Sequence, residues 1–430
     1  MSKQSQIHST INQWKERGGN LWDMLEKFQN IPITNSDDAV AIVNALNSLS
    51  FEDKSNDTEE IYQVSDACRI LVTFFQQADS QEVFNIFVNQ GLSQLRRIFT
   101  YLVNQPDSKN EINLLMFILR LLAEYRQEED ARLIAKIARS GFQSNNHMWE
   151  NILHAFTVEH PYCDIVINTL AVPLPKDFLG IVYLDVVNDL VRNGFIKKHP
   201  FDTESGIEYL RELFLSKTNF SYAHSAAASL PFLTSFHREG LIQLAKQHID
   251  PYVHMESAWA MATIGDYSGV ELLKKMAVDA RYSNLACQYL KGLGCGNKIP
   301  TIVFDDDFKA MVEASDWLDH PQEYGKVPDE ISLYDTRALY WPPTDDERKV
   351  WLFKYIYKGD KDVEASWGFV MVGGSTTFSL FGEYHADFKA EDVYGVHCVW
   401  ELEVNEDARM PESRNAKAGL AILRQYNPSF

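Results

Sequence analysis

The sequence predicts a mainly α-helical protein, an α-solenoid of helical pairs followed by a smaller C-terminal α+β domain with an antiparallel sheet. Three observations predict this fold class. From Ile61 to about Gly294, apolar residues recur at three- and four-residue intervals in segments separated by short polar stretches. Similar segments repeat at a nearly constant offset between residues 225 and 294. After Pro300 the helical spacing is replaced by alternation of apolar and polar residues.

The composition limits the class of protein and its partners. A chain of 430 residues is too long for one core, and we expect about two to four packing units. The formal net charge is −20, and no run of Lys and Arg is long enough to follow a phosphate backbone, so nucleic acid is a poor partner. About 25 acidic against about 13 basic residues follow residue 300, which favours a protein partner with a basic surface.

Cysteine usage and the apolar runs predict a location in a reducing cytoplasm. The five cysteines are scattered and contain no C-x-x-C pair, which argues against a disulfide framework and a zinc knuckle. The first ten residues lack the apolar segment of a secretory signal. Apolar runs such as residues 114–123 are interrupted by Arg or are too short to cross a bilayer, so we expect no membrane association. We also expect no cofactor.

The chain is expected to have four parts. Residues 1–60 form an N-terminal helical segment, with helices over 4–16 and 20–29 divided by Gly18 and Gly19. A third helix over 37–49 is expected to be capped by Asn35 or Ser36. The other expected parts are the solenoid over 61–299, with helices over 59–77 and 111–125 among others, a connector over 300–349, and the α+β domain over 350–430.

A repeat is clearest in the second half of the helical region. Residues 225–236 align with 256–267, and residues 258–265 align with 287–294. Each unit places small residues early in a helix, which lets neighbouring helices approach closely. Gly265 and Gly294 are expected to end these helices in a left-handed turn, and residues 266–277 form the second helix of a pair.

Residues 219–295 resemble HEAT repeats, most closely the short class found in phycobilisome lyase-type proteins. The resemblance implies a solenoid, and it implies as one alternative function the handling of a chromophore, with a bilin-like ligand on the concave face. A lyase would need an exposed His or Cys beside an Arg. Cys287 lies instead on the face expected to be packed, which counts against that alternative.

Residues 253–266, "VHMESAWAMATIGD", allow a test for a metal site. In the HEAT-type hydroxylase, successive His-Glu dyads at the starts of repeat helices bind two irons. Here Met255 occupies the His position beside Glu256, and His254 falls one position early. One repeat earlier, His224 is followed by Ser225 rather than Glu. Because a helix turns about 100° per residue, these imidazoles would not converge, and a packed helical spine is favoured.

The C-terminal region predicts strands with an aromatic face. Residues 350–358 alternate strictly, with Trp351, Phe353, Tyr355 and Tyr357 on one side. Strands over 367–372 and 377–384 follow, joined by the turn "GGST". Residues 393–404 fit both a strand and a helix, and the alternation favours a strand. An amphipathic helix is expected over 413–426.

Polar motifs in this region suggest one alternative metal site. On an extended segment, Glu383, His385 and Asp387 would share one side, and His397 would add a fourth ligand. A polar strand edge explains the same residues and is favoured. The stretch "VGGSTT" lacks the Lys of a phosphate loop, and "FDDDFK" is better explained by helix capping through Asp305 or Asp306.

The function that these patterns favour is a non-catalytic protein-binding scaffold or adaptor. The concave face of a solenoid offers a long contact surface, and aromatic side chains often anchor such contacts. The residues expected to contact a partner are Trp259, Tyr282, Tyr289, Tyr340 and Trp341. The alternatives are a lyase-like protein that handles a cofactor or chromophore, and a metal-dependent enzyme or hydrolase that uses the C-terminal domain.

Overall fold

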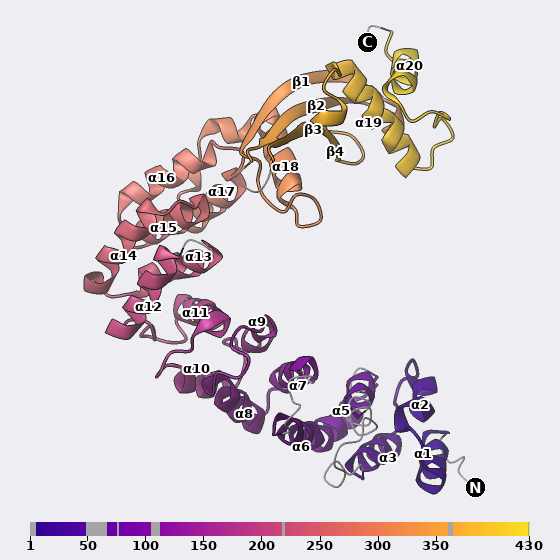
Figure 1. Ribbon diagram of the computed structural model, residues 1–430, viewed down its shortest axis with the longest axis vertical. Coiled ribbons are helices and arrows are strands. Elements are labelled where there is room, and N and C mark those ends of the chain that lie inside the picture. The colour runs from indigo at the N-terminus through magenta and orange to yellow at the C-terminus, as the bar shows by residue number, and fades with distance from the viewer. Residues whose placement is uncertain are drawn as a thin grey trace. The chain divides into compact units, whose positions relative to one another are not determined.

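The computed structural model of this chain describes residues 6–48, 67–74, 77–104, 112–216, 220–359, 364–428 and 430. The predicted fold class is confirmed, because the chain is mainly helical and its C-terminal part carries a four-stranded antiparallel sheet (Figure 1). Backbone contacts divide the chain into two units, Met1–Leu244 and Ala245–Phe430. The boundary falls inside α14, so the expected solenoid range of 61–299 belongs to both units.

The first unit is helical. Its helices are α1 (Gln6–Arg17), α2 (Leu21–Leu25), α3 (Ser36–Asn47), α5 (Gln81–Ile86), α6 (Leu92–Val103), α7 (Ile112–Glu124), α8 (Glu128–Arg139), α9 (Met148–Leu153), α10 (Cys163–Leu170), α11 (Asp177–Arg192), α12 (Glu204–Leu215), α13 (Phe220–Ser229) and most of α14 (Ser235–Gln247). The predicted cap of the third helix is confirmed, since the Asn35 side chain accepts a hydrogen bond from the Asp37 amide at 2.8 Å and caps α3. Most of the helix predicted over 59–77 lies outside the described residues, although 67–74 are helical.

Helix α7 illustrates how the helical region buries its apolar residues. The sequence is apolar nearly all round, which predicts cover on more than one side. Its buried residues are Leu115, Met116, Ile118, Leu119, Leu121, Leu122 and Ala123. These positions occupy both flanks of the helix, so the prediction is confirmed.

The second unit begins with three helices that follow the predicted repeat. They are α15 (Pro251–Thr263), α16 (Tyr267–Ala277) and α17 (Ser283–Gly292). The glycines after α15 and α17 are left-handed as predicted, with φ of +89° at Gly265 and +69° at Gly294. Helices α15 and α16 cross closely because Gly269 has no side chain, and a Cβ there would collide with the carbonyl oxygen of Ala258.

The α+β domain of this unit is a three-layer structure. Its elements are α18 (Asp306–Asp319), β1 (Glu330–Trp341), β2 (Asp346–Tyr357), β3 (Ser366–Val372), β4 (Ser379–Phe381), α19 (Ala390–Val404) and α20 (Ala416–Tyr426). The strands pair in sequence order, and every pair is antiparallel. Along β2, Phe353 and Tyr355 pack under α18, whereas Val350 and Leu352 pack under α19 and α20. The predicted strand alternation therefore separates two cores.

The strand favoured for residues 393–404 is wrong, because these residues belong to helix α19. The sheet covers one side of this helix and α20 covers the other, so most of its positions are buried whichever way they point. Burial includes His397 and Glu401, whereas Trp400 and Val404 are 41% and 62% exposed. A helix covered on two sides loses its 3.6-residue apolar period, and the remaining pattern resembled alternation.

The range expected to be a connector, 300–349, contains α18 and β1. The sheet thus begins before residue 350. Strand β1 was missed because it lies at the edge of the sheet and most of its residues are exposed or half-buried, so its sequence lacks apolar alternation. The strand expected over 377–384 is reduced to Ser379–Phe381 and is followed by a turn of 3-10 helix at Gly382–Tyr384. The Asp305 cap of α18 and the helix expected over 413–426 are confirmed.

No helix among the described residues has the length and apolar character needed to cross a membrane.

Candidate functional site

Two aromatic pairs connect helices α15 and α17. The two members of each pair come from successive repeats. The Tyr252 and Tyr282 rings meet edge to face with centroids 5.6 Å apart, and the Trp259 and Tyr289 rings are 6.1 Å apart. All four side chains are half-buried. The Arg281 guanidinium lies 5.2 Å from the centre of the Tyr282 ring. Three residues expected to contact a partner therefore lie on corresponding helices of two successive repeats, where they also stabilise the packing between repeats.

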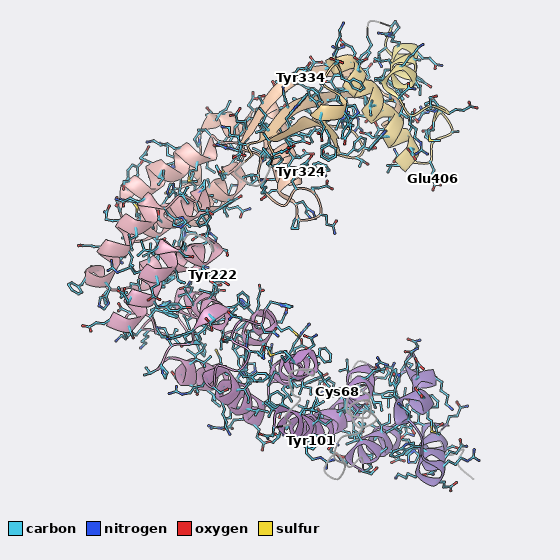
Figure 2. The ribbon with its side chains drawn as sticks, in the orientation of Figure 1. Cys68, Tyr101, Tyr222, Tyr324, Tyr334 and Glu406 are labelled. Atoms are coloured by element: carbon cyan, nitrogen blue, oxygen red, sulfur yellow. The ribbon has the colours of Figure 1, made fainter. Side chains whose placement is uncertain are left out.

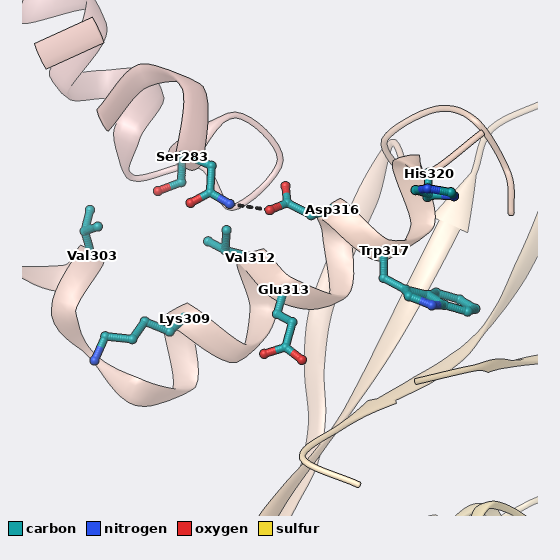
Figure 3. Close-up of a pocket in the computed structure, with 9 residues that line it drawn as sticks. Ser283, Val303, Lys309, Val312, Glu313, Asp316, Trp317 and His320 are labelled. Carbon is teal, nitrogen blue, oxygen red and sulfur yellow. Dashed lines mark hydrogen bonds between the residues drawn. The ribbon is translucent and has the colours of Figure 1, made fainter. Parts of the chain in front are cut away.

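Helix α18 presents two different faces. Ala310, Ala314 and Leu318 pack against the sheet. The positions of Glu313, Asp316, Trp317 and His320 follow an i, i+3, i+4, i+7 spacing, which places them on a second stripe. These residues line a cavity of about 510 Å³ whose other wall is formed by α17 and the turn before α18 (Figure 3). We call this cavity the α17–α18 groove.

The α17–α18 groove brings together carboxylates and an indole ring. Asn284 of α17 donates a hydrogen bond to the Asp316 carboxylate. Partial burial at this contact raises the pKa of Asp316, and the neighbouring charge of Asp319 raises it further. Lys309, at the edge of the groove, pairs with Asp306 at 3.0 Å. Asp316 and Glu313 are therefore not neutralised by the one lysine that lines the groove.

Hydrogen bonds connect helix α17, one wall of the groove, to the sheet of the α+β domain. Arg281, at the start of α17, forms a paired contact with Asp279 and donates to the carbonyl oxygen of Asp329 at 2.7 Å. The Asp329 carboxylate accepts from the Lys358 amide, also at 2.7 Å. These bonds connect the last repeat to the end of β2 and the approach to β1. They fix the position of α17 relative to the sheet that carries α18.

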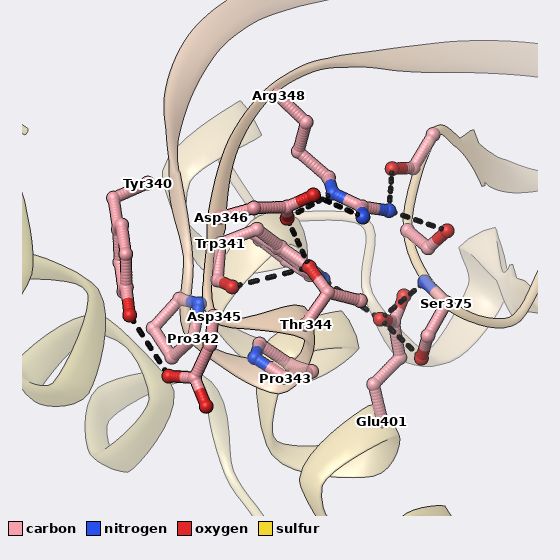
Figure 4. Close-up of polar contacts among 12 residues, drawn as sticks. Tyr340, Trp341, Pro342, Pro343, Thr344, Asp345, Asp346, Arg348, Ser375 and Glu401 are labelled. Atoms are coloured by element: carbon pink, nitrogen blue, oxygen red, sulfur yellow. Dashed lines mark hydrogen bonds and ion pairs between the residues drawn. The ribbon is translucent and has the colours of Figure 1, made fainter.

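A buried polar cluster lies on the opposite side of the sheet (Figure 4). One carboxylate oxygen of Glu401 accepts hydrogen bonds from the Trp341 indole at 2.7 Å, the Ser375 amide at 2.7 Å and the Ser375 hydroxyl at 2.8 Å. Burial raises the pKa of Glu401, although these hydrogen bonds oppose the shift. Arg348 donates to the carbonyl oxygens of Gly373 and Gly374 and so fastens the same loop. Glu401 and Trp341 are fully buried while Ser375 is exposed, so the cluster fastens a surface loop to the core, which indicates a structural role.

Two residues predicted to contact a partner, Tyr340 and Trp341, lie at this cluster. The prediction is wrong for Trp341. Trp341 is fully buried and its indole N–H is bonded to Glu401, so it cannot contact a partner. Tyr340, on the other side of the strand, is half-buried, stacks on Tyr426 at 5.2 Å and donates to Asp345 at 2.8 Å. Adjacent strand residues point to opposite faces, which explains why neighbouring aromatic residues have different environments.

The alternative metal site is not supported by the geometry. Glu383 lies in the 3-10 turn and His385 caps it, so the extended segment that would align them with Asp387 is absent. The Nδ1–H group of His385 is 2.8 Å from the carbonyl oxygen of Phe381, and His397 is fully buried on α19. Within the described part of the chain, no group of three or more His, Cys, Asp and Glu side chains is placed to hold a metal ion.

Of residues 253–266, those up to Thr263 belong to α15, and the last three form the turn to α16. Met255 is fully buried and Glu256 is 5% exposed, both among the small residues that pack between helices. Ser257 donates to the carbonyl oxygen of His254 at 2.8 Å, which is a bond within the helix. Cys287 is buried as expected.

The α17–α18 groove was missed by sequence reasoning. Asp316, Trp317 and Glu313 lie in a range that was interpreted as the beginning of a connector. A signal was present, since "FKAMVEASDWLDH" places small apolar residues on one helical stripe and acidic and aromatic residues on another. What the sequence does not show is that α17 supplies the opposite wall.

Comparison with known proteins adds no family assignment: no protein-family model matches the chain, and no curated protein matches it.

Proposed function

We propose that this chain is a non-catalytic protein-binding adaptor whose α17–α18 groove binds a basic segment of a partner protein. The observation that carries the proposal is the placement of the Asp316 and Glu313 carboxylates beside the Trp317 indole in one groove of about 510 Å³. A carboxylate forms charge-assisted hydrogen bonds with Lys or Arg, and an indole face attracts the same cations.

The surroundings of the groove favour a basic partner. Residues 301–430 carry about 25 acidic against about 13 basic residues, and such a field accelerates the approach of a positive segment. One aromatic pair of α15 and α17 lies beside the groove, since Ser283 in its wall follows Tyr282 directly, and the other pair lies further along the same helices. Tyr252, Tyr282, Trp259 and Tyr289 therefore extend the contact surface, and the acids supply its charge preference.

The test is binding of a fluorescent eight-residue peptide of alternating Lys and Ala to the full chain, measured by anisotropy. We expect the double variant Glu313→Gln, Asp316→Asn to weaken binding at least tenfold, which corresponds to about 1.4 kcal/mol. The matched control is Glu347→Gln, Glu412→Gln, which removes the same charge from two exposed sites of the same unit. It should change the affinity less than twofold. Equal losses in the two variants would show that net charge alone attracts the peptide and would contradict the proposal.

The raised pKa of Asp316 gives the binding a pH dependence. Protonation removes the charge that a cation needs, so affinity should fall as the pH decreases through this raised pKa. Asp316→Asn should bind weakly at neutral pH and lose most of this dependence. An unchanged pH profile in Asp316→Asn would exclude Asp316 from the contact.

A further inference from the structure

A second cavity, of about 460 Å³, lies in the same domain at the C-terminal end of α18. Its walls come from the end of α18 and the following turn, the segment that leads into β4, β4 itself and the outer face of α19. Five aromatic side chains dominate the lining: Trp317, Tyr324, Phe378, Phe381 and Trp400. Tyr324 is labelled in Figure 2, in the segment that follows α18. We call this cavity the aromatic cavity.

The rings of the aromatic cavity form two walls that are held from behind. The Phe378 and Trp400 rings are 5.1 Å apart and tilted by 34°, and the Tyr324 and Phe381 rings are 6.1 Å apart and tilted by 58°. The Tyr324 hydroxyl is 2.6 Å from that of Tyr355, which is buried in the sheet. Phe378 stacks on the buried His397 ring at 4.5 Å. The walls are therefore preorganised by the fold.

These aromatic surfaces remain accessible although the domain has two apolar cores that could cover them. Phe381 is 48% exposed and Trp400 is 41% exposed, while Trp317, Tyr324 and Phe378 are half-buried. Large rings exposed together around one cavity are typical of a binding site rather than of a scattered surface.

The charge around the aromatic cavity favours a cation. Its lining contains Glu323 and no Lys or Arg. Burial lowers the pKa of His397 to about 3, so the imidazole behind Phe378 is uncharged at neutral pH. Elsewhere in the domain the chain's own cations lie over aromatic rings, with Lys354 at 4.4 Å from Trp367 and Lys326 at 5.0 Å from Tyr357. The lining of the aromatic cavity supplies no such cation, so a cation over these rings would come from a ligand.

We propose that the aromatic cavity binds a methylated ammonium group. A cation over several aromatic faces is attracted by their quadrupoles, and the attraction is largest for cations that lose little hydration. An unmodified ammonium carries three N–H donors that need acceptors, which ring faces do not supply well. A quaternary ammonium has no N–H donor and presents methyl groups to the rings. The inference is independent of the proposed partner groove, apart from Trp317, which lines both cavities.

The test is calorimetric titration of the full chain with tetramethylammonium and with choline. The control ligand is 3,3-dimethylbutanol, which has the shape of choline without its charge. We expect saturable binding of both cations and at least tenfold weaker binding of the neutral alcohol. Comparison with a short peptide that contains one trimethyllysine identifies the source of the group, since a small-molecule site favours choline and a side-chain site favours the peptide.

Variants of the lining residues test whether the cation binds in the aromatic cavity. Trp400→Ala should weaken binding at least fivefold and Glu323→Gln about twofold to threefold. The control Tyr384→Ala removes a ring that is 77% exposed and does not line the cavity, and it should change affinity less than twofold. Unchanged circular dichroism shows that each variant is folded. The proposal is overturned if neither cation nor the trimethyllysine peptide saturates the wild type, if the neutral alcohol binds equally well, or if Trp400→Ala binds normally. Glu313→Gln, Asp316→Asn should leave this binding intact, which separates the two proposals.

Discussion

The three repeat helices of the second unit and the α+β domain beside them are stabilised in different ways. Helices α15, α16 and α17 bury short apolar side chains such as Ala258, Ala277 and Ala286, and their backbones approach closely. The α+β domain buries two apolar cores and also encloses Glu401 and His397. Both regions bury polar side chains, among them Glu256 in the repeats, and in the domain one buried carboxylate, that of Glu401, accepts hydrogen bonds from two other segments of the sheet region.

The largest expected effect distinguishes the two regions directly. Glu401→Ala leaves the Trp341 indole and the Ser375 amide and hydroxyl without their buried acceptor. We expect the α+β domain to lose about 3 to 5 kcal/mol of unfolding free energy, from the unsatisfied indole donor together with the cavity that the side chain leaves. Amide hydrogen exchange measures this loss in α19, and α16 serves as the internal control. Glu401→Gln retains an acceptor oxygen and should cost less than the alanine variant. Equal protection of α19 in all three proteins would show that the cluster is not a stabilising contact.

A smaller effect is expected where two helices touch through glycine. Gly419 of α20 lies against the backbone of Gly395 in α19, and an added Cβ would collide with it. Gly419→Ala should therefore destabilise the domain by about 2 to 3 kcal/mol. Its control is Gly240→Ala in the exposed middle of α14, where a Cβ meets no atom within 4 Å. That change should stabilise the protein by about 0.5 to 1 kcal/mol, because Ala favours the helix. Urea unfolding compares the two, and a stabilising Gly419→Ala would contradict the close crossing.

The smallest effect depends on pH. Burial lowers the pKa of His397 to about 3, whereas an unfolded histidine titrates near 6.5. As the pH decreases, this histidine therefore binds a proton in the unfolded chain before it does so in the folded chain. The stability of the folded state with uncharged His397 is fully present above about pH 6.5 and is lost as the pH falls below that value. His397→Phe retains an aromatic ring against Phe378 and removes this loss. Relative to wild type, the variant should gain about 2 kcal/mol between pH 7 and pH 5 in urea unfolding. Glu401, whose pKa is raised, shifts both proteins equally and cancels in the comparison. Parallel pH profiles would show that His397 is protonated in the folded domain.

The difference between the regions also explains how much the sequence could predict. The boundaries of α16, the left-handed Gly265 and the Asn35 and Asp305 caps follow from local chemistry, and they were predicted. Helix α19 was assigned as a strand because cover from both sides removes the helical period. No local pattern distinguishes a helix of that kind from a buried strand.

The candidate site was harder to predict than the fold because it depends on neighbours distant in sequence. Trp341 was selected for its aromatic character, yet its burial depends on Glu401, sixty positions later. Asp316 was overlooked, although its position beside Asn284 gives the groove its charge. Tyr282 and Tyr289 were predicted as partner contacts, and their rings lie against those of Tyr252 and Trp259. Residues that repeat could be placed from the sequence, and residues that meet across α17 and α18 could not.

The most direct test of the proposed function is hydrogen exchange of the full chain with and without the Lys-Ala peptide. We expect added protection in residues 283–292 and 306–319, with smaller changes in α15 and none in α20. Protection confined to other segments would contradict the assignment of the α17–α18 groove as the partner site. The same protection in the double variant Glu313→Gln, Asp316→Asn, measured at the peptide concentration that saturates the wild type, would contradict it as well.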